Sequence, residues 1–394
     1  MQNLNPNSLN GPLRESERTL LQLIRDRGPL SKAELARISG MSAQGVAVIM
    51  DGLIGSGIVL KGVKQRGRVG QPSTPLTINP EGAFSVGLHV GNGRMIGSLV
   101  DFAGNTLERR IVTNDLPPDE VDEKGAIDLV ETLIGALGEA LRDRMIGICI
   151  VTRDELMAKC GDPRMSVERR LVSMSGKTLQ SELQRHFGLR VMCENETRAG
   201  AIAELRSAPE IAERGLFYIR LGCNVDSALA LNGRLMGDIG APQGQLGTLP
   251  LCEERGCLND VASVRVLDKK LVEGGTSLST ALEIGFTRPQ ETDIVDRWAE
   301  EVKEDLALAA VCATAAVPIE VLVFEGPLPS ATLEKFAKES EKACAELNRR
   351  LEVSARVGSF GMDAPSIGAA LLPLQYLFAP DPSLFAPKRA QRAA

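Results

Sequence analysis

Residues 31–57 read SKAELARISGMSAQGVAVIMDGLIGSG, and this stretch predicts two short helices joined by a tight turn. Ser31 stands at a helix N-cap position with Glu34 three residues later, the spacing of a capping box. Gly40 ends this helix, and Ser42 is placed to cap the next one. The second helix carries apolar residues at the i, i+3, i+4, i+7 spacing of a buried face: Val46, Ile49, Met50 and Leu53. Two helices joined in this way predict a helix-turn-helix, whose second helix enters the major groove of DNA.

Another helix precedes this pair, and a basic hairpin follows it. The segment ESERTLLQLIRDRG, residues 15–28, places Leu20, Leu21 and Ile24 on one face and stops at Gly28-Pro29. Residues 58–80 alternate like a β-hairpin, and four basic residues lie near its glycine-rich tip: Lys61, Lys64, Arg66 and Arg68. Residues 1–80 are therefore predicted to form a winged helix-turn-helix, with the wing beside phosphates or in a narrow minor groove. The alternative is a three-helix packing module with a solvated basic loop.

The predicted recognition helix offers few side chains that read bases. Gln44 is the one good base reader, able to form two hydrogen bonds with adenine, and Ala47 and Val48 follow it. We expect the DNA contacts to come from the helix-turn-helix and the wing: Ser31, Ser42, Gln44, Gly45, Lys61, Lys64, Arg66 and Arg68. One such head supplies little specificity, so a homo-oligomer (a dimer or tetramer) on a palindromic operator is predicted.

The charge of the chain is unevenly distributed. Residues 1–80 hold ten Lys or Arg against five Asp or Glu, whereas the remainder holds 35 against 46, within a net charge of -6 over 394 residues. A basic head on an acidic body suggests that the head meets a polyanion, although chance clustering is the alternative. The N-terminus lacks a secretory pattern, no apolar run reaches the roughly 20 residues of a membrane span, and the eight cysteines are scattered. These features predict a cytoplasmic protein with reduced thiols and no membrane partner.

From Phe84 onward, strand-like and helix-like segments alternate, which predicts an α/β body of two lobes. The expected strands are SVGLHVGNGRMIGSLVDFAGN (two strands around a turn), MIGICIV, LRVMCEN, LFYIRLG, SALALNG and IEVLVFEG. Helices are expected between them, among them GAIDLVETLIGALGEALRDR at residues 125–144 and RWAEEVKEDLALAAVCATAAV at residues 297–317.

Four features in order resemble the ROK family of repressors and sugar kinases. They are the predicted winged helix followed by GQPSTPLTINP, the turn VDFAGN, the segment CENETRAGAIAEL and the segment RGCLNDVAS. The resemblance runs from about Leu13 to about Leu372. It implies an actin-like, ribonuclease-H-type body behind the winged helix, with one lobe over residues 81–200 and a second over 201–394. The C-terminal segment would return to the first lobe, and the tail from about residue 380 would be disordered.

The resemblance also implies that the nucleotide turns are lost. Family kinases hold ATP phosphate with Asp-x-Gly-Gly-Thr, whereas residues 89–93 read HVGNG, so His89 replaces the acid that would ligate magnesium. The second phosphate turn, Leu-Gly-Thr-Gly-Ile-Gly in the family, reads LGCNVD at 221–226, and the adenosine turn, normally a glycine triplet, reads FEGPLP at 324–329. Amides cradle phosphate only where glycine permits close approach. We therefore expect no ATP and no kinase activity.

The sugar and zinc positions of the family are altered too. The implied effector-binding residues are Asn195, Glu196, Gln245, Thr248 and Asn259. Two acids of the family have become neutral here, at Gln245 and Asn259, and its histidine has become Thr248. A polar pocket favours a bound sugar or sugar derivative over a filled, silent core. The zinc positions retain only Cys252 and Cys257, a poor structural site. Those cysteines are interpreted as small core residues, with no metal and no cofactor.

The resulting prediction is a DNA-binding transcriptional regulator, a repressor of carbohydrate-related genes, with a non-catalytic body that senses an effector and oligomerises. Two alternatives stay open. The body could be a sugar kinase resembling glucokinase, or the chain could be a DNA-binding scaffold without an effector.

Overall fold

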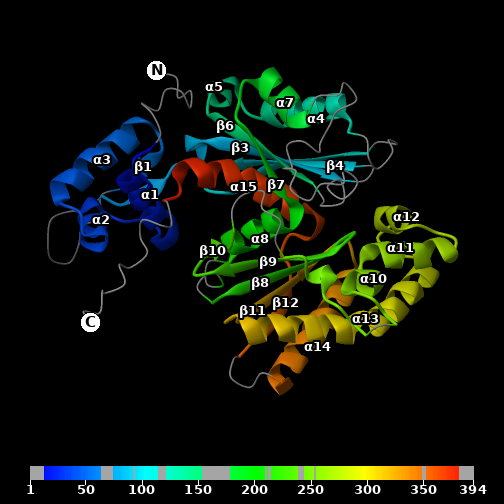
Figure 1. Ribbon diagram of the computed structural model, residues 1–394. Helices are drawn as coiled ribbons and strands as arrows, with labels where there is room; N and C mark the ends of the chain where they lie inside the picture. Colours follow the sequence, from blue (N-terminus) through cyan, green and yellow to red (C-terminus); the bar gives the residue numbers. More distant parts are fainter. Residues whose placement is uncertain are drawn as a thin grey trace.

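The computed structural model describes residues 13–63, 74–91, 94–113, 121–152, 178–208, 211, 214–237, 244–252, 254–347 and 352–380. Figure 1 shows a helical head at one end and two β-sheets with their helices beside it. The predicted wing residues Lys64, Arg66 and Arg68 lie outside the described residues, as do Asn92, Gly93 and the predicted disordered tail. Across the described ranges, no helix is long and apolar enough to cross a membrane.

The head contains three helices and a two-stranded antiparallel sheet, which is the element order of a winged helix-turn-helix. Its elements are α1 (Glu15–Arg27), α2 (Lys32–Ser39), α3 (Ala43–Gly55), β1 (Val59–Lys61) and β2 (Leu76–Ile78). The predicted capping box is confirmed, because Ser31 Oγ accepts from the Glu34 N–H (3.3 Å) and Glu34 Oε2 accepts from the Ser31 N–H (2.8 Å). Gly40 adopts the left-handed conformation (φ 71°) that ends α2. The predicted apolar stripes of α1 and α3 form the core of the head.

The first sheet has the strand order β5-β4-β3-β6-β7. Strands β5, β4 and β3 pair antiparallel, whereas β6 and β7 run parallel to β3. The helices α4, α5 and α7 lie along one side of it (Figure 1). The bounds are β3 (Phe84–Gly91), β4 (Arg94–Asp101), β5 (Thr106–Thr113), β6 (Met145–Thr152), β7 (Val191–Asn195), α4 (Glu123–Gly135), α5 (Glu139–Arg142) and α7 (Leu179–Phe187).

The second sheet repeats this topology with the order β10-β9-β8-β11-β12. Again three strands pair antiparallel and two run parallel to the central one. Helices α13 and α14 cover its outer face through a core that includes Trp298 and Phe336. The bounds are β8 (Leu216–Leu221), β9 (Val225–Leu231), β10 (Arg234–Leu235), β11 (Val321–Glu325), β12 (Ser354–Val357), α10 (Leu258–Ala262), α11 (Val264–Glu273), α12 (Leu278–Glu283), α13 (Pro289–Ala316) and α14 (Ser330–Leu347). The repeat confirms the predicted two-lobed, actin-like α/β body.

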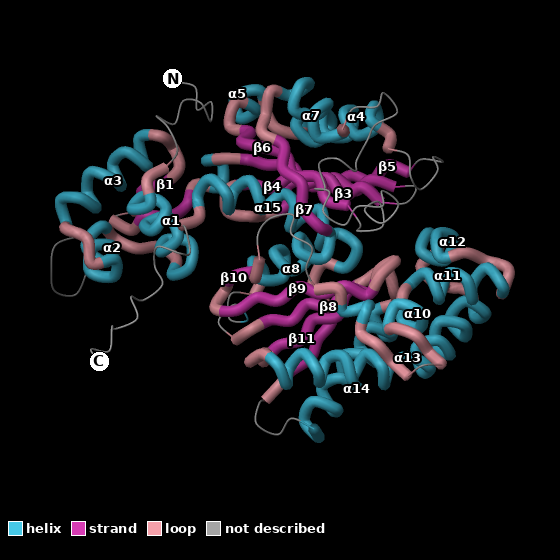
Figure 2. The backbone as a smooth tube through the Cα atoms, in the orientation of Figure 1, coloured by secondary structure: helices cyan, strands magenta, loops and turns pink. Residues whose placement is uncertain are grey.

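Helices α8 (Glu196–Ser207) and α15 (Ala364–Phe378) lie between the two sheets (Figure 2). Helix α15 follows the second sheet in sequence but packs on β3 and β6 of the first. The Ser85 hydroxyl on β3 donates to the carbonyl of Ala370 on α15. The two helices touch at backbone level, because a side-chain carbon at Gly368 would lie 1.7 Å from the Ala199 carbonyl oxygen. Together, α8 and α15 form the layer that joins the lobes.

All the strands expected from the apolar segments are present, but three others were not predicted. These are β5, β10 and β12, which are short or lie at a sheet edge. Strand β5 has exposed side chains on both faces, so it lacks the apolar alternation of a half-buried strand. The helix predicted over residues 125–144 is interrupted, because α4 ends at Gly135 and α5 begins only after Gly138.

Candidate functional site

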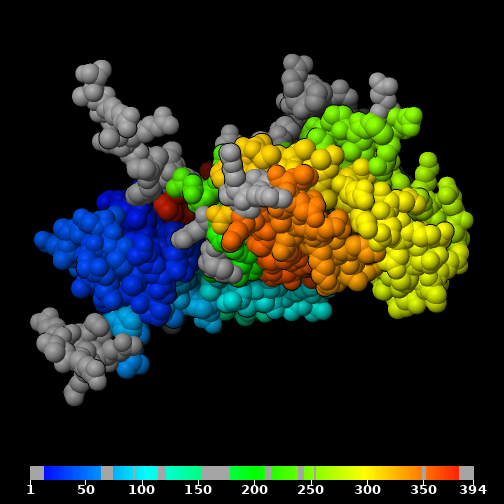
Figure 3. Space-filling view, turned by 90° about the horizontal axis from the view of Figure 1, so that it is seen from below, coloured from blue at the N-terminus to red at the C-terminus, as the bar shows by residue number. Residues whose placement is uncertain are grey.

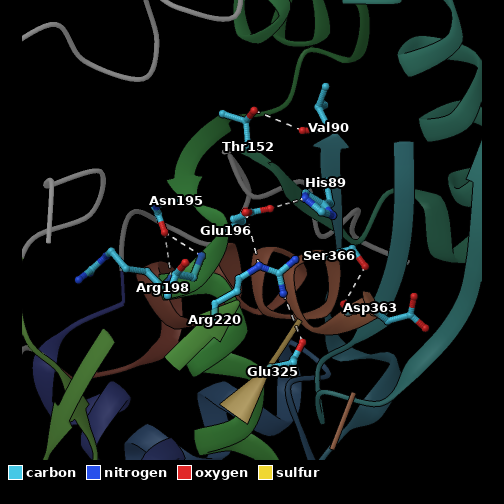
Figure 4. A network of polar contacts seen from close by, with 11 residues as sticks. His89, Val90, Thr152, Asn195, Glu196, Arg198, Arg220, Glu325, Asp363 and Ser366 are labelled. Atoms are coloured by element: carbon cyan, nitrogen blue, oxygen red, sulfur yellow. Dashed lines mark hydrogen bonds and ion pairs between the residues drawn. The ribbon is translucent and has the colours of Figure 1, made fainter. Parts of the chain in front are cut away.

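Four buried ionisable side chains form a continuous row in the centre of the body, here called the charge ladder: His89, Glu196, Arg220 and Glu325 (Figure 4). His89 Nε2 lies 2.8 Å from Glu196 Oε2. On the other side, Arg220 Nε lies 3.5 Å from Glu196 Oε1, and Arg220 Nη1 lies 3.5 Å from Glu325 Oε1. The exposed fraction is 9% for His89 and zero for Glu325, with the other two between them. The charge ladder therefore links the two lobes through groups screened from water.

The chain topology explains why these residues meet. His89 lies near the end of β3, Glu196 follows β7, and Arg220 and Glu325 lie at the ends of β8 and β11. In α/β sheets the carboxyl ends of the strands face the ligand-binding crevice. Arg220 and Glu325 are register partners on adjacent parallel strands. Each is a charged residue at the end of an apolar strand, LFYIRL or VLVFE, a signal that the sequence prediction did not use.

The electrostatics of the charge ladder are set by burial. Burial raises the pKa of Glu325 to about 8, although the Arg220 cation acts in the opposite direction. For Arg220, burial alone would lower the pKa, but Glu196, Tyr218 and Glu325 together raise it above its usual value. Burial also raises the pKa of the Tyr218 hydroxyl. Arg220 is thus a permanent cation that holds the Glu196 carboxylate, whereas Glu325 favours its neutral form near pH 7.

The second of the family's phosphate turns, residues 221–226, is closed by its own contacts. The Gly222 N–H donates to the Asn224 carbonyl (2.9 Å), and the Val225 N–H donates to Asn259 Oδ1 (2.7 Å). A side-chain carbon on Gly222 would lie 3.4 Å from Glu196 Oε1, which puts the ladder carboxylate against this turn. Two amides of the kind that cradle phosphate are thus already satisfied within the protein, beside a negative charge.

The predicted effector residues fall into two groups. Asn195 and Glu196 lie in the buried centre, where Asn195 Oδ1 caps α8 by accepting from the Thr197 N–H (2.7 Å). Gln245, Thr248 and Asn259 belong to the second lobe, on or beside the 3-10 helix η3 (Leu246–Thr248) and on α10. Gln245 and Thr248 are exposed, and the Thr248 hydroxyl donates to the Gln245 carbonyl (2.8 Å). Asn259 supports the phosphate turn, as described above. Sequence reasoning did not include His89, Arg220 and Glu325 among the site residues.

The interpretation of the two zinc-position cysteines as core residues is wrong. Cys252 is exposed, and Cys257 is half-buried with its Sγ 3.0 Å from Asp260 Oδ2. Cys257 stands at the N-cap position of α10, and the next residue, Leu258, is the one that enters the hydrophobic core of the second lobe. Among the residues that the structure describes, no three His, Cys, Asp or Glu side chains gather as a metal-binding group.

The predicted DNA-binding residues of the head differ in accessibility. Ser42 and Gln44 are exposed at the start of α3, Gly45 is half-buried, and Lys61 is exposed at the end of β1. Val48, one turn after Gln44, is 69% exposed. Ser31 is buried at 7% exposure, and its hydroxyl caps α2, so its side chain offers little surface to a ligand. Seen from below, the head projects from one end of the body (Figure 3).

The fold and the site define a class: an actin-like, two-lobed body carrying an N-terminal winged-helix unit. Residues 85–376 match the model described as "ROK family", and the chain belongs to this family.

The similar proteins include both transcriptional regulators and sugar kinases of the family. The xylose repressor of Bacillus subtilis (strain 168) is 23% identical over 270 residues, which cover 65% of this chain and 67% of that protein. A solved ROK family transcriptional regulator, a homologue of the E. coli MLC protein, superimposes with a TM-score of 0.65 at 18% identity, covering 92% of this chain and 96% of that one. A ROK family glucokinase from Streptomyces griseus, solved with glucose and AMPPNP, gives a TM-score of 0.52 at 17% identity over 74% of this chain and 99% of that one. At these identities the structural likenesses show the shared fold.

Proposed function

We propose that this protein is a DNA-binding transcriptional repressor of carbohydrate-related genes, with a ROK body that senses a small polar effector and transfers no phosphate. The observation that carries the proposal is the head, whose α3 helix stands exposed with Gln44 and Val48 on its surface. The B. subtilis relative is named a xylose repressor, which supports the same function.

The charge and shape of the head suit duplex DNA. Residues 1–80 hold ten Lys or Arg against five Asp or Glu, so the head attracts the phosphate backbone while the acidic body does not. Helix α3 has no charged side chain before Asp51, so its exposed face suits base edges and methyl groups better than phosphates. Ser42, Gln44 and Gly45 would lie in the groove, and Lys61 and the wing would lie along the backbone.

The centre of the body argues against phosphoryl transfer. In the family the residue matching Glu196 is the base that deprotonates the sugar hydroxyl. Here its carboxylate is held by His89 and Arg220 and lies against Gly222, in a phosphate turn whose amides are partly used. A carboxylate that contacts His89 and pairs with the Arg220 cation is a poor proton acceptor, because protonation would weaken the pairing with Arg220. We infer that the body is not an enzyme and binds neither ATP nor zinc.

The uncharged side chains at the predicted effector positions suit an uncharged polyol. Asn195, Gln245, Thr248 and Asn259 offer amides and a hydroxyl, which can donate to and accept from sugar hydroxyls. We therefore propose a sugar or sugar derivative as effector, a homo-oligomer (dimer or tetramer) bound to a palindromic operator, and a cytoplasmic location.

The proposal is tested by selecting bound duplexes from a random-sequence pool with the full-length protein. Enrichment of one palindromic site, together with sedimentation as a dimer or larger species, is the expected result. Enrichment of no sequence, or a monomer footprinting a single unpaired half-site, contradicts it.

Only the fold favours the kinase alternative, since kinases such as the S. griseus glucokinase share it. Sugar-dependent release of ADP that disappears in Glu196→Gln would establish it.

The scaffold alternative is separated by thermal shift with a panel of sugars and sugar phosphates. A ligand at 100 times its Kd adds about 2.7 kcal/mol to the free energy of unfolding. Absence of any shift across the panel would favour the scaffold.

A further inference from the structure

Helix α8 runs from the charge ladder to the turn at Phe102, where the body contacts α1 of the DNA-binding head. Its first residue, Glu196, is the central carboxylate of the ladder, and Arg206 lies in its last turn. Ten residues of α-helix span about 15 Å at 1.5 Å per residue. One straight, mostly buried element therefore reaches both the centre of the body and the surface on which the head rests.

The head end of α8 is built around Phe102, in the turn after β4. The Arg206 guanidinium donates to the carbonyl of Ala103, the next residue. Arg25 of α1 lies over the Phe102 ring, 5.0 Å from its centroid, and donates to the Phe102 carbonyl (3.4 Å). Phe378, the last residue of α15, packs edge-on against the same ring with centroids 4.6 Å apart. Burial, and then the nearby Arg206 cation, lower the pKa of Arg25 to about 10, in keeping with two guanidinium groups held close at this contact.

The head and the body share one hydrophobic core at this contact. Leu20, Leu21 and Ile24 of α1 belong to the same buried cluster as Phe102 and the second half of α15. Arg18 of α1 also donates to the Ala379 carbonyl (3.4 Å) just beyond α15. The head is therefore packed on the body, and because cores are close-packed, a shift of the turn at Phe102 would displace α1.

Along its length, α8 has little freedom to move independently of its neighbours. A side-chain carbon at Gly200 would lie 2.2 Å from the Tyr218 hydroxyl oxygen, so α8 lies directly on the second sheet. The Arg198 guanidinium donates to the carbonyls of Met236 (2.7 Å) and Gly237 (3.2 Å). These interactions fix the helix to the second lobe, and its backbone contact with α15 at Gly368 fixes it to the first.

We propose that α8 is the element that couples the charge ladder to the DNA-binding head: a change in the contacts of Glu196 alters the docking of α1 on Phe102 through Arg206. As a means of regulation, this coupling rests on the proposed repressor function, but the coupling itself exists whether or not the head binds DNA.

The test is a double-mutant cycle read by amide hydrogen exchange of the full-length protein without DNA. Glu196→Gln changes the charge at the ladder end of α8 with little change of side-chain shape. Arg206→Gln removes the guanidinium that contacts the Ala103 carbonyl at the other end of the helix. In the Glu196→Gln protein, exchange of the α1 amides over residues 15–27 is expected to accelerate several-fold. In the Arg206→Gln background, adding Glu196→Gln is expected to leave α1 exchange unchanged. The matched control is Arg185→Gln, which changes an exposed arginine of α7 on the far side of the first lobe. In that background, Glu196→Gln is still expected to accelerate exchange of the α1 amides.

If Glu196→Gln does not fold, His89→Gln replaces it, because it removes the imidazole of β3 that contacts Glu196. The proposal is overturned if exchange of the α1 amides is the same in Glu196→Gln as in the wild type. It is also overturned if Glu196→Gln still accelerates that exchange in the Arg206→Gln background. Neither result depends on DNA, so a failed coupling is distinguishable from a failed repressor assignment. Where operator binding has been found, the same cycle in operator affinity shows whether the coupling is used.

Discussion

His89 Nε2 and Glu196 Oε2 lie 2.8 Å apart, and this contact joins the first strand of one lobe to the helix that rests on the other. Both residues stand at positions that the kinases of the family use for magnesium and for the catalytic base. In this chain the two side chains contact each other, and Arg220 places a permanent cation beside the Glu196 carboxylate. If the body transfers no phosphate, as we propose, these two residues serve as an internal contact between β3 and α8.

Arg220→Met should be strongly destabilising. The change leaves the Glu196 carboxylate buried without its permanent cation, and removing one partner of a buried ion pair costs about 3–5 kcal/mol. The control is Arg214→Met, because the Arg214–Glu320 pair is about half exposed on both sides and should contribute at most about 1 kcal/mol. Urea unfolding of both variants measures the difference. Equal losses would show that the charge ladder does not stabilise the body.

Glu325→Gln should change how stability depends on pH. The pKa of Glu325 in the folded protein is about 8, above its ordinary 4.5, so the folded state keeps a proton that the unfolded chain has lost. Glu325 therefore lowers stability progressively as the pH rises from about 5 to 8, and its effect levels off above that range. Denaturant unfolding at several pH values should show a steeper decline for the wild type than for Glu325→Gln. Parallel curves would mean that Glu325 is ionised throughout.

The exposed face of α3 should determine operator sequence through Gln44 and Val48. Gln44→Ala should lower discrimination at one base pair by about 1–3 kcal/mol and leave binding to random DNA nearly unchanged. Val48 is 69% exposed, and an apolar side chain in the groove contacts the methyl group of thymine. Replacing one operator thymine by deoxyuridine should therefore weaken the wild type several-fold but not Val48→Ala. Full sensitivity of Val48→Ala to that replacement would place the contact elsewhere.

The basic wing should supply affinity without sequence preference. Lys61 is exposed, and Lys64, Arg66 and Arg68 follow it in the sequence. Each phosphate contact that is removed should lower the slope of log affinity against log salt by about 0.9. Arg66→Ala and Arg68→Ala are thus expected to weaken operator and random duplexes alike, with an extra loss on AT-rich sites if a guanidinium enters a narrow minor groove. Wild-type affinity in both variants would mean that the wing is a solvated loop.

Zinc should be present at less than one ion per chain. Cys252 and Cys257 are two thiols on an exposed loop, and a structural zinc site requires four donors. Elemental analysis of the purified protein measures the metal directly. One tightly held zinc per chain that is lost in Cys252→Ser would show that other donors complete the site.

The sequence by itself determined the local structure of this protein. The capping box of Ser31 and Glu34, the glycine turn at Gly40 and the apolar stripe of α3 depend on neighbours a few residues apart, and all three are present in the structure. The apolar strands of the body, such as β3, β6, β8 and β11, were equally readable, since each buries a run of apolar residues. Exposed edge strands such as β5 escaped prediction, because pairing with a neighbour holds them in place and their own side chains do not.

Only the tertiary structure decided what the centre of the body has become. His89, Glu196, Arg220 and Glu325 are far apart in sequence and come from four different elements, so no local pattern ties them together. Arg220 and Glu325 become partners because their strands lie side by side in parallel register. The same holds for Arg25, Phe102 and Phe378, which meet because α15 returns across the first sheet to the head. Local sequence sets which helices and strands form, whereas buried charges and shared cores depend on which of those elements the fold brings together.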